Sequence, residues 1–249
     1  MRSTEQDTHF GFRTIPKGEK ADRVRDVFIG VSSRYDLMND LMSGGMHRIW
    51  KNALVDWLMP QQDQRILDLA GGTGDIALRI VERQPNASLT VLDLTEEMLA
   101  MGRDRAARLR SSGDIAWITG SADALPFAAD SFDACTVAFG IRNFPDIPES
   151  LAEMHRVLRP GGRLLILEFG HVEVSGLRRL YDRYSFSVLP RLGNLVLNDR
   201  ESYQYLVESI RRFPRRKEFA GMIEAAGFVN VAVRNMSFGV ASIHSAWKI

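Results

Sequence analysis

The stretch Arg65-Ile-Leu-Asp-Leu-Ala-Gly-Gly-Thr-Gly-Asp75 decides the fold of this chain. It begins with a near-continuous apolar run, continues into a cluster of glycines and passes into the helix-periodic segment Ile76–Val81. A buried strand, a glycine turn and a helix in this order form the βα unit of nucleotide-binding proteins. The glycines let the backbone approach a ligand, and the following helix presents its N-terminus. The stretch therefore predicts a ligand with a nucleoside part at the end of its strand.

Strands and helices alternate on the carboxyl side of this unit. The predicted strands are Arg65–Ala70, Ser88–Leu94, Ile115–Thr119, Phe132–Phe139 and Arg163–Phe169, and the predicted helices are Ile76–Arg83, Glu96–Leu109 and Ile147–Leu158. Two further strands, Phe228–Asn235 and Val240–Trp247, lie too close together for a crossover connection, so we expect them to be antiparallel. The predicted fold class is α/β, with a doubly wound, seven-stranded, mostly parallel sheet and an antiparallel C-terminal strand pair.

The segment before the first strand is mainly helical in its pattern. Residues 1–21 are polar and predict a loose arm, whereas Asp22–Val31 and His47–Leu58 have the apolar spacing of helices. We therefore predict an N-terminal arm and helical cap in residues 1–62 and a ligand-binding domain in residues 63–249. A helical insertion rich in aromatic and basic residues, Val172–Phe213, is expected within the second unit.

Composition narrows the classes of function. The chain has 249 residues, a formal net charge of +1 and one cysteine, Cys135. The near-neutral charge argues against a nucleic-acid partner. A lone cysteine excludes an intramolecular disulfide and a cysteine-built zinc site. The N-terminus has no secretory signal pattern and no apolar run has the length of a membrane span, so we expect a cytoplasmic protein with at most peripheral membrane contact.

Three features identify the type of nucleotide. The glycine cluster departs from Gly-x-Gly-x-x-Gly, because Ala77 stands at the last position, and this disfavours a dinucleotide. Asp93 ends the second strand, where an acidic residue binds ribose hydroxyls. After the third strand, Gly120-Ser-Ala-Asp-Ala-Leu-Pro-Phe127 places small polar residues at the sheet edge, as an adenine would need.

Together with the antiparallel terminal pair, these features resemble class I methyltransferases that use S-adenosylmethionine (SAM). Further blocks are similar to the C-methyltransferases of ubiquinone and menaquinone biosynthesis, including Ser33-Arg-Tyr-Asp-Leu-Met-Asn39, His47-Arg-Ile-Trp50 and Phe139-Gly-Ile-Arg-Asn143. Ala70, where the wider class has glycine, also points to this branch. The resemblance implies SAM as co-substrate without a metal. The cofactor-binding residues that it implies are Gly71, Gly72, Thr73, Asp93, Ser121 and Ala122.

The resemblance implies C-methylation of a polyprenyl benzoquinol ring, a demethylmenaquinol ring, or both. Arg142 and Asn143 follow the fourth strand and are candidate catalytic residues. An arginine there could pair with a phenolate, and an asparagine could form a hydrogen bond with a ring oxygen. A purely structural role for either residue is the alternative. Tyr35 of the cap is the third catalytic candidate, against simple helix packing. His47 and Glu168 are further candidates for the base that takes the ring proton. The alternatives are methylation of another lipophilic phenol and a non-catalytic scaffold of a quinone-synthesis assembly.

The composition of two segments indicates contact with lipid. The insertion has the aromatic and aliphatic residues that a prenyl tail would need, and Arg211-Arg-Phe-Pro-Arg-Arg-Lys217 is a basic run that suits anionic head groups or, more simply, solvent. We therefore expect a lipophilic quinol as partner and a protein peripherally associated with the inner face of the membrane. A homodimer or a quinone-synthesis complex is compatible with this expectation.

Overall fold

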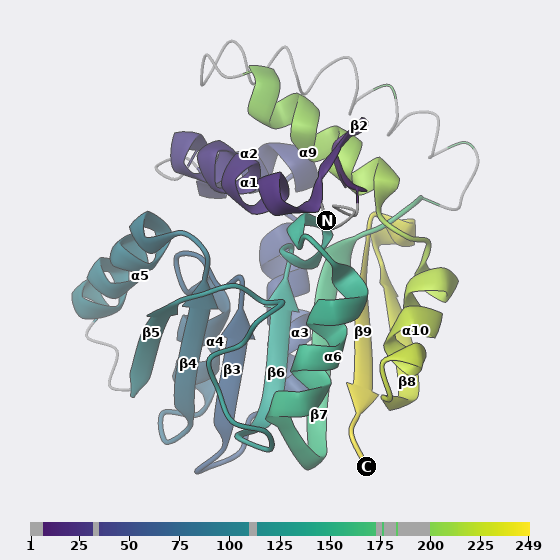
Figure 1. Ribbon diagram of the computed structural model, residues 1–249. Coiled ribbons are helices and arrows are strands. Elements are labelled where there is room, and N and C mark those ends of the chain that lie inside the picture. The colour runs from purple at the N-terminus through teal and green to yellow at the C-terminus, as the bar shows by residue number, and fades with distance from the viewer. Residues whose placement is uncertain (1–6, 32–34, 110–113, 173–175, 177–182, 184–199) are drawn as a thin grey trace, which may run out of the picture.

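The computed structural model describes residues 7–31, 35–109, 114–172, 176, 183 and 200–249 (Figure 1). Its centre is a seven-stranded sheet of order β5-β4-β3-β6-β7-β9-β8. The strands are β3 (Arg65–Leu69), β4 (Ser88–Asp93), β5 (Ile115–Thr119), β6 (Phe132–Ala138), β7 (Leu158–Phe169), β8 (Val229–Met236) and β9 (Ala241–Trp247). Strands β3 to β7 pair in parallel, and β9 is antiparallel to both β7 and β8. The predicted fold class is confirmed.

The helices between the strands also match their predictions closely. They are α4 (Asp75–Arg83), α5 (Glu96–Arg108) and α6 (Ile147–Val157), and a further helix, α10 (Arg216–Ala225), precedes β8. Strand β7 differs, because it starts at Leu158 and not at Arg163. Leu158 pairs with Phe132 across a bulge, and the amide of Gly161 donates to the carbonyl of Lys248, so residues 158–162 also belong to the sheet.

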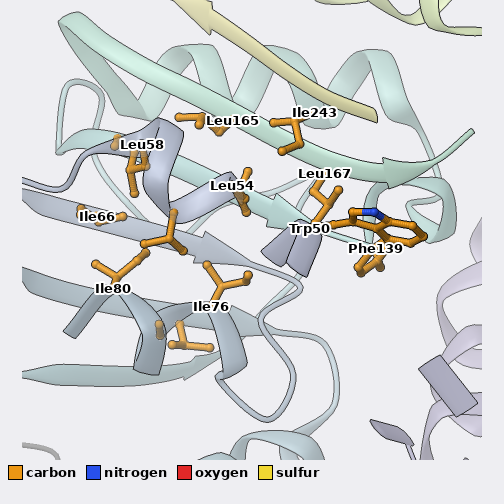
Figure 2. Close-up of a cluster of buried hydrophobic side chains, with 14 of the residues drawn as sticks. Trp50, Leu54, Leu58, Ile66, Ile76, Ile80, Phe139, Leu165, Leu167 and Ile243 are labelled. Carbon is orange, nitrogen blue, oxygen red and sulfur yellow. The ribbon is translucent and has the colours of Figure 1, made fainter. Parts of the chain in front are cut away.

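Two apolar layers hold the helices against the sheet. One lies under α3 (His47–Leu58) and α4, and the other lies under α6 and α10. In the first layer, shown in Figure 2, Trp50 packs against Phe139 and Phe169 and donates its indole N–H to the hydroxyl of Ser237, 3.0 Å away. This indole joins the cap to the sheet at the edge where β6 and β7 end.

The prediction of a loose arm in residues 1–21 is wrong for the part that is described. Residues Asp7–Phe10 (β1) and Arg13–Pro16 (β2) form an antiparallel hairpin, and α1 (Lys17–Val31) begins directly after it. The hairpin is held by contacts with distant residues. Phe10 stacks on Tyr205 with ring centroids 4.2 Å apart, and the hydroxyl of Thr8 donates to the carbonyl of Pro145. A local sequence pattern cannot predict contacts with residues so distant along the chain.

Two helices of the cap and one from the predicted insertion cover the carboxyl edge of the parallel strands. Helices α1, α2 (Tyr35–Ser43) and α9 (Arg200–Arg212) lie across this edge in Figure 1. Helix α9 is the only long part of the predicted insertion Val172–Phe213 within the described residues, and most of that segment lies outside them. The division at residue 62 stays a prediction. Within the part of the chain that is described, no helix has the length and apolar character to cross a bilayer.

Candidate functional site

A cavity of about 970 Å³, part of it open to solvent, lies between the cap and the carboxyl ends of β3, β4 and β6. The cavity brings together every residue predicted to bind the co-substrate, namely Gly71, Gly72, Thr73, Asp93, Ser121 and Ala122. Asn143, Phe139 and Phe144 line the same space. Binding by each residue stays a prediction, but the arrangement fits a nucleoside ligand.

The glycine turn after β3 needs its glycines for two separate reasons. A Cβ at Gly71 would lie 2.6 Å from Cγ1 of Val91, which leaves no space for a side chain. Gly72 has a φ of +54°, in the left-handed region that favours glycine. The first glycine is thus required by packing and the second by its backbone conformation, and both line the cavity.

Asp93 connects the glycine turn with the start of α5. One of its carboxylate oxygens accepts from the amide of Gly72 and the other from the amide of Thr95, each at 2.9 Å. Burial raises the pKa of Asp93, and these amides oppose that effect. Since Asp93 also lines the cavity, it is held in place for the ribose contact that the sequence predicts.

Ala70 adopts a strained conformation that requires a glycine opposite it. Its φ is +49°, and its methyl group faces Gly140, where an added Cβ would lie only 2.5 Å from the Cβ of Ala70. Gly140 itself has a φ of −114°, which any residue adopts. Gly140 is therefore glycine because of contact with Ala70 and not because of its own backbone.

We expect Gly140→Ala to lower the free energy of unfolding by about 1–3 kcal/mol through overpacking. The double variant Ala70→Gly/Gly140→Ala should regain most of this loss, because it removes the methyl group that clashes. Ala70→Gly alone should change little, since relief of the left-handed strain offsets the added chain entropy of glycine. Urea denaturation of the four proteins measures these differences. A double variant as unstable as Gly140→Ala would contradict the proposed contact.

Arg142 faces away from this cavity. It lies in the short helix η2 (Ile141–Asn143), and its guanidinium contacts Glu168 of β7 at 2.8 Å, the carbonyl of Phe139 at 2.5 Å and the hydroxyl of Ser209 at 3.3 Å. The side chains of Arg142 and Glu168 are 3% and 0% exposed. Burial raises the pKa of Glu168, and Arg142 opposes this. The pair joins β6, β7 and α9, and direct catalysis by either residue stays a prediction.

Asn143 lines the cavity and is hydrogen-bonded to a residue of α9. The hydroxyl of Tyr205 donates to its side-chain oxygen at 2.8 Å, and this hydroxyl is buried. The sequence analysis did not single out Tyr205 for this position. Tyr35, the third catalytic candidate, is the first residue of α2, but its side chain lies outside the described part of the structure.

We expect Tyr205→Phe to cost about 1 kcal/mol of stability, because it removes one buried hydrogen bond but keeps the ring that stacks on Phe10. It should also lower the rate of methyl transfer if Asn143 must be held rigidly. Gln204→Ala is the matched control on the same helix, since it removes only an exposed hydrogen bond to Glu208. Denaturation curves and initial rates for both variants test this. Equal stability losses in the two variants would show that the buried hydrogen bond contributes no more than the exposed one.

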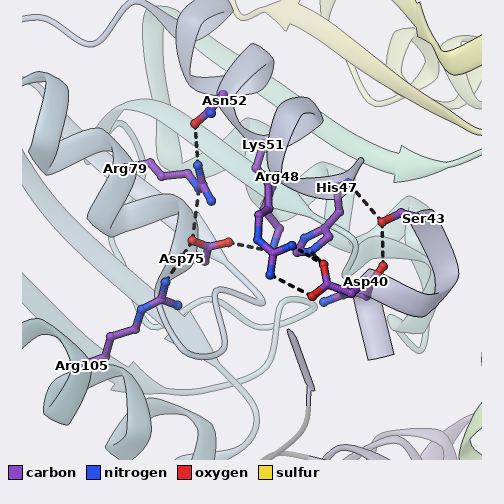
Figure 3. A network of polar contacts seen from close by, with 10 residues as sticks. Asp40, Ser43, His47, Arg48, Lys51, Asn52, Asp75, Arg79 and Arg105 are labelled. Atoms are coloured by element: carbon purple, nitrogen blue, oxygen red, sulfur yellow. Dashed lines mark hydrogen bonds and ion pairs between the residues drawn. The ribbon is translucent and has the colours of Figure 1, made fainter. Parts of the chain in front are cut away.

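His47, a candidate base, belongs to an ion-pair network of the cap (Figure 3). Its Nε2 lies 2.9 Å from a carboxylate oxygen of Asp40, which also binds Arg48. Burial lowers the pKa of His47, with a further lowering by Lys51. The imidazole is not part of the cavity wall as described.

The cavity wall includes residues that the sequence analysis missed. Helix α1 contributes Ala21, Val24 and Phe28, whose helical spacing was the available signal. Lys51 of α3 also lines the cavity, as does Asp68 of β3, which belongs to the stretch 65–75 that the sequence analysis singled out. Burial raises the pKa of Asp68 to about 7, against a hydrogen bond from Thr136 at 2.8 Å. Among the described residues, no group of acidic, histidine or cysteine side chains could hold a metal ion.

Comparison with solved structures supports the fold. A SAM-dependent methyltransferase of Thermotoga maritima, described as a possible histamine N-methyltransferase, aligns with a TM-score of 0.61 at 18% identity, covering 90% of this chain and 99% of that one. The phosphoethanolamine N-methyltransferase 2 of Haemonchus contortus, in complex with SAM, aligns with a TM-score of 0.58 at 17% identity, over 80% and 52% of the two chains.

Comparison of sequences is more specific. The ubiquinone/menaquinone biosynthesis C-methyltransferase UbiE of Paracoccus denitrificans is 59% identical over 98% of both chains. The protein of the same name from Dinoroseobacter shibae is 57% identical over 99% of both. The sequence model of the ubiE/COQ5 methyltransferase family matches residues 17–248. With the cavity and the sheet already described, these matches establish that the chain belongs to the ubiE/COQ5 methyltransferase family.

Proposed function

We propose that this SAM-dependent methyltransferase C-methylates the ring of a polyprenyl benzoquinol, of a demethylmenaquinol, or of both. The observation that carries the proposal is the cavity at the ends of β3, β4 and β6, which contains the glycine turn, Asp93 and Asn143 in a chain so similar to enzymes named for this reaction. The reaction forms one carbon–carbon bond, breaks one sulfur–carbon bond and releases the ring proton to solvent or to a base.

The chain's own contribution is mainly positioning. Bound SAM supplies an electrophilic methyl group, so no metal is needed to activate it. Asp93 and the glycine turn hold the nucleoside, while Phe28, Phe139 and Phe144 offer apolar surface for an aromatic ring. Orienting two reactants in this way contributes on the order of 7–11 kcal/mol in favourable cases.

A phenolate form of the quinol makes its ring carbon a better nucleophile, and hydrogen-bond donors stabilise that charge. In our proposal the side-chain amide of Asn143 donates to a ring oxygen, and its orientation is set by Tyr205. In this proposal Arg142 keeps the η2 turn, and with it Asn143, in position. Tyr35 is proposed to orient the ring of the quinol. An arginine side chain keeps its proton at neutral pH and is therefore a poor base.

We also propose peripheral contact with the inner face of the membrane, from which a prenylated substrate would enter. The cap presents exposed apolar side chains, namely Ile29, Leu37, Met46 and Ile49. Co-sedimentation with vesicles of phosphatidylglycerol, compared with phosphatidylcholine, tests this contact. Ile49→Asn should reduce binding to both, and unchanged binding would argue against the cap as the contact surface. Assembly into a homodimer or a quinone-synthesis complex is a separate proposal that size-exclusion chromatography tests.

The deciding experiment for the activity is transfer of labelled methyl from SAM to a quinol. Demethyl benzoquinol and demethylmenaquinol, each with a prenyl tail, are compared with a panel of soluble phenols. We expect labelled product from at least one quinol and much less from the phenols. Preference for a soluble phenol would favour the alternative substrate class, and folded protein that binds SAM but labels no acceptor would favour a scaffold.

A further inference from the structure

A second cavity, of about 850 Å³ and partly open to solvent, lies among the N-terminal hairpin, α9 and the start of α6. Its wall also includes residues of α1, η2 and α10. Of the described residues, Phe144 and Pro145 line both this cavity and the one at the ends of β3, β4 and β6. The glycine turn and Asp93 belong to the other cavity, so the methyl-transfer reaction leaves this one without a ligand.

Lys20 brings a buried positive charge to this second cavity. The residue is 6% exposed, and its ammonium donates to the carbonyl of Phe144 at 2.7 Å. Within the part of the chain that is described, Lys20 forms no ion pair. An ammonium group can donate three hydrogen bonds, so further donors remain for a ligand. Burial lowers the pKa of Lys20 to about 8, and Asp146 opposes this, so the side chain is charged at neutral pH.

Asp146, the acidic residue of the cavity wall, is already bound by other donors. One of its carboxylate oxygens accepts from the amide of Glu149 at 2.9 Å and caps α6, and the other accepts from Lys17 at 3.1 Å. Lys17 also donates to Glu149 at 2.6 Å. Asp146 therefore attracts Lys20 without bonding to it. A buried charge is costly unless it is paired, and an anion in the cavity would reduce that cost.

Other basic side chains line the same cavity from different elements. His9 of β1 and Arg212 of α9 are both exposed. Arg142 also lines the cavity, but its charge is neutralised by Glu168 at 2.8 Å. Donors thus approach the cavity from α1, β1 and α9. Such an arrangement suits an anion with several acceptor oxygens, as a phosphate group has.

We propose that this second cavity binds a phosphate group, with the Lys20 ammonium and the Arg212 guanidinium as its donors. Ile147, Phe213 and Met222 also line the cavity and offer apolar surface to the molecule that carries the phosphate. The same group can come from a phospholipid head group or from free phosphate, and the apolar residues favour the lipid. The proposal concerns a site separate from the methyl-transfer cavity and does not depend on the identity of the quinol.

Calorimetry and thermal unfolding of the full chain test the proposal. The probes are inorganic phosphate, glycerol 3-phosphate and a short-chain phosphatidylglycerol below its micelle concentration, each compared with sodium chloride of the same ionic strength. We expect at least one probe to bind and to raise Tm, since a ligand of the folded state stabilises it. Tighter binding of the phospholipid than of glycerol 3-phosphate would identify lipid as the source. Equal or weaker binding of the phospholipid would identify free phosphate.

Lys20→Met should weaken the tightest of these probes about tenfold or more, because it removes a hydrogen bond from a charged donor. Arg212→Met should weaken it about threefold or more, a smaller effect because this side chain is exposed. Arg23→Met is the matched control. It removes one positive charge from the same helix as Lys20, but Arg23 pairs with Glu19 at the surface and does not line the cavity. Its affinity for the probe should change less than about twofold.

SAM binding shows whether each variant is folded, since none of the three residues lines the SAM cavity as described. If Lys20→Met no longer binds SAM, Arg212→Met decides. The proposal is overturned if the unmodified protein binds no probe more strongly than chloride. It is also overturned if folded Lys20→Met or Arg212→Met binds the probe no more weakly than Arg23→Met does. Either result leaves the quinol proposal intact.

Discussion

Glu168→Gln is expected to lower the free energy of unfolding by about 3–5 kcal/mol, because it leaves the Arg142 guanidinium buried without a counterion. Glutamine keeps the size of the side chain, so the loss reports charge and not packing. The same loss is expected for Arg142→Met, which leaves the carboxylate of Glu168 buried with only the amides of Arg142 and Phe169 to bind it. Urea denaturation at neutral pH measures both.

The double variant Arg142→Met/Glu168→Gln should be considerably more stable than either single variant, because replacing a whole buried ion pair often costs little. Glu19→Gln is the control, since its exposed pair with Arg23 should contribute well under 1 kcal/mol. If the double variant folds and still transfers methyl groups, Arg142 has a structural role. A folded double variant that binds SAM but has lost transfer would support the direct role predicted from the sequence.

Asp68→Asn is expected to make the ligand-free protein more stable at pH 8, by roughly 2–4 kcal/mol, and to change its stability little near pH 4. Burial raises the pKa of Asp68 to about 7, while in the unfolded chain it has its ordinary value near 3.8. The folded protein therefore keeps a proton that the unfolded chain has already lost, and stability falls as pH rises through this window. Each pKa unit corresponds to about 1.4 kcal/mol.

The Asp68→Asn variant and the original protein are compared at the same pH. This cancels the contributions of other titratable groups to the free energy of unfolding, including those of Asp75 and Lys51 near the Asp68 carboxyl group. Thr136→Val should move the pH window of the Asp68 form upward, because it removes the hydrogen bond that favours the charged carboxylate. Denaturation curves between pH 4 and pH 8 measure both effects. A difference between Asp68→Asn and the original protein that does not vary with pH would show that Asp68 does not titrate in this range.

The fold class and the six residues predicted to bind the co-substrate could be read from the sequence because their signals are local. The turn from Gly71 to Gly74 needs backbone without side chains, and the ends of β3, β4 and β5 must lie at one edge when the strands are parallel. Asp93 is the last residue of β4 and Ser121 lies shortly after β5, so the parallel direction of the strands places both at the same edge of the sheet.

Other features depend on contacts that no local pattern encodes. The hairpin of residues 7–16 lies in a segment expected to be loose, but it contacts Tyr205 and Pro145, which are far along the chain. Arg142 follows β6 as the sequence indicated, but Glu168 of the neighbouring strand draws its guanidinium away from the cavity. A side chain's direction is set by the partner that it finds in the folded protein.

The sequence by itself determined the parallel sheet, the glycine turn and the family, because hydrophobic periodicity, glycine placement and ordered sequence blocks are all written along the chain. Only the tertiary structure decided that Ala70 requires Gly140, that Tyr205 holds Asn143, and that Lys51 of the cap reaches the cavity. These are pairings between segments distant in sequence, and packing settles them because buried methyl groups need space and buried charges need partners.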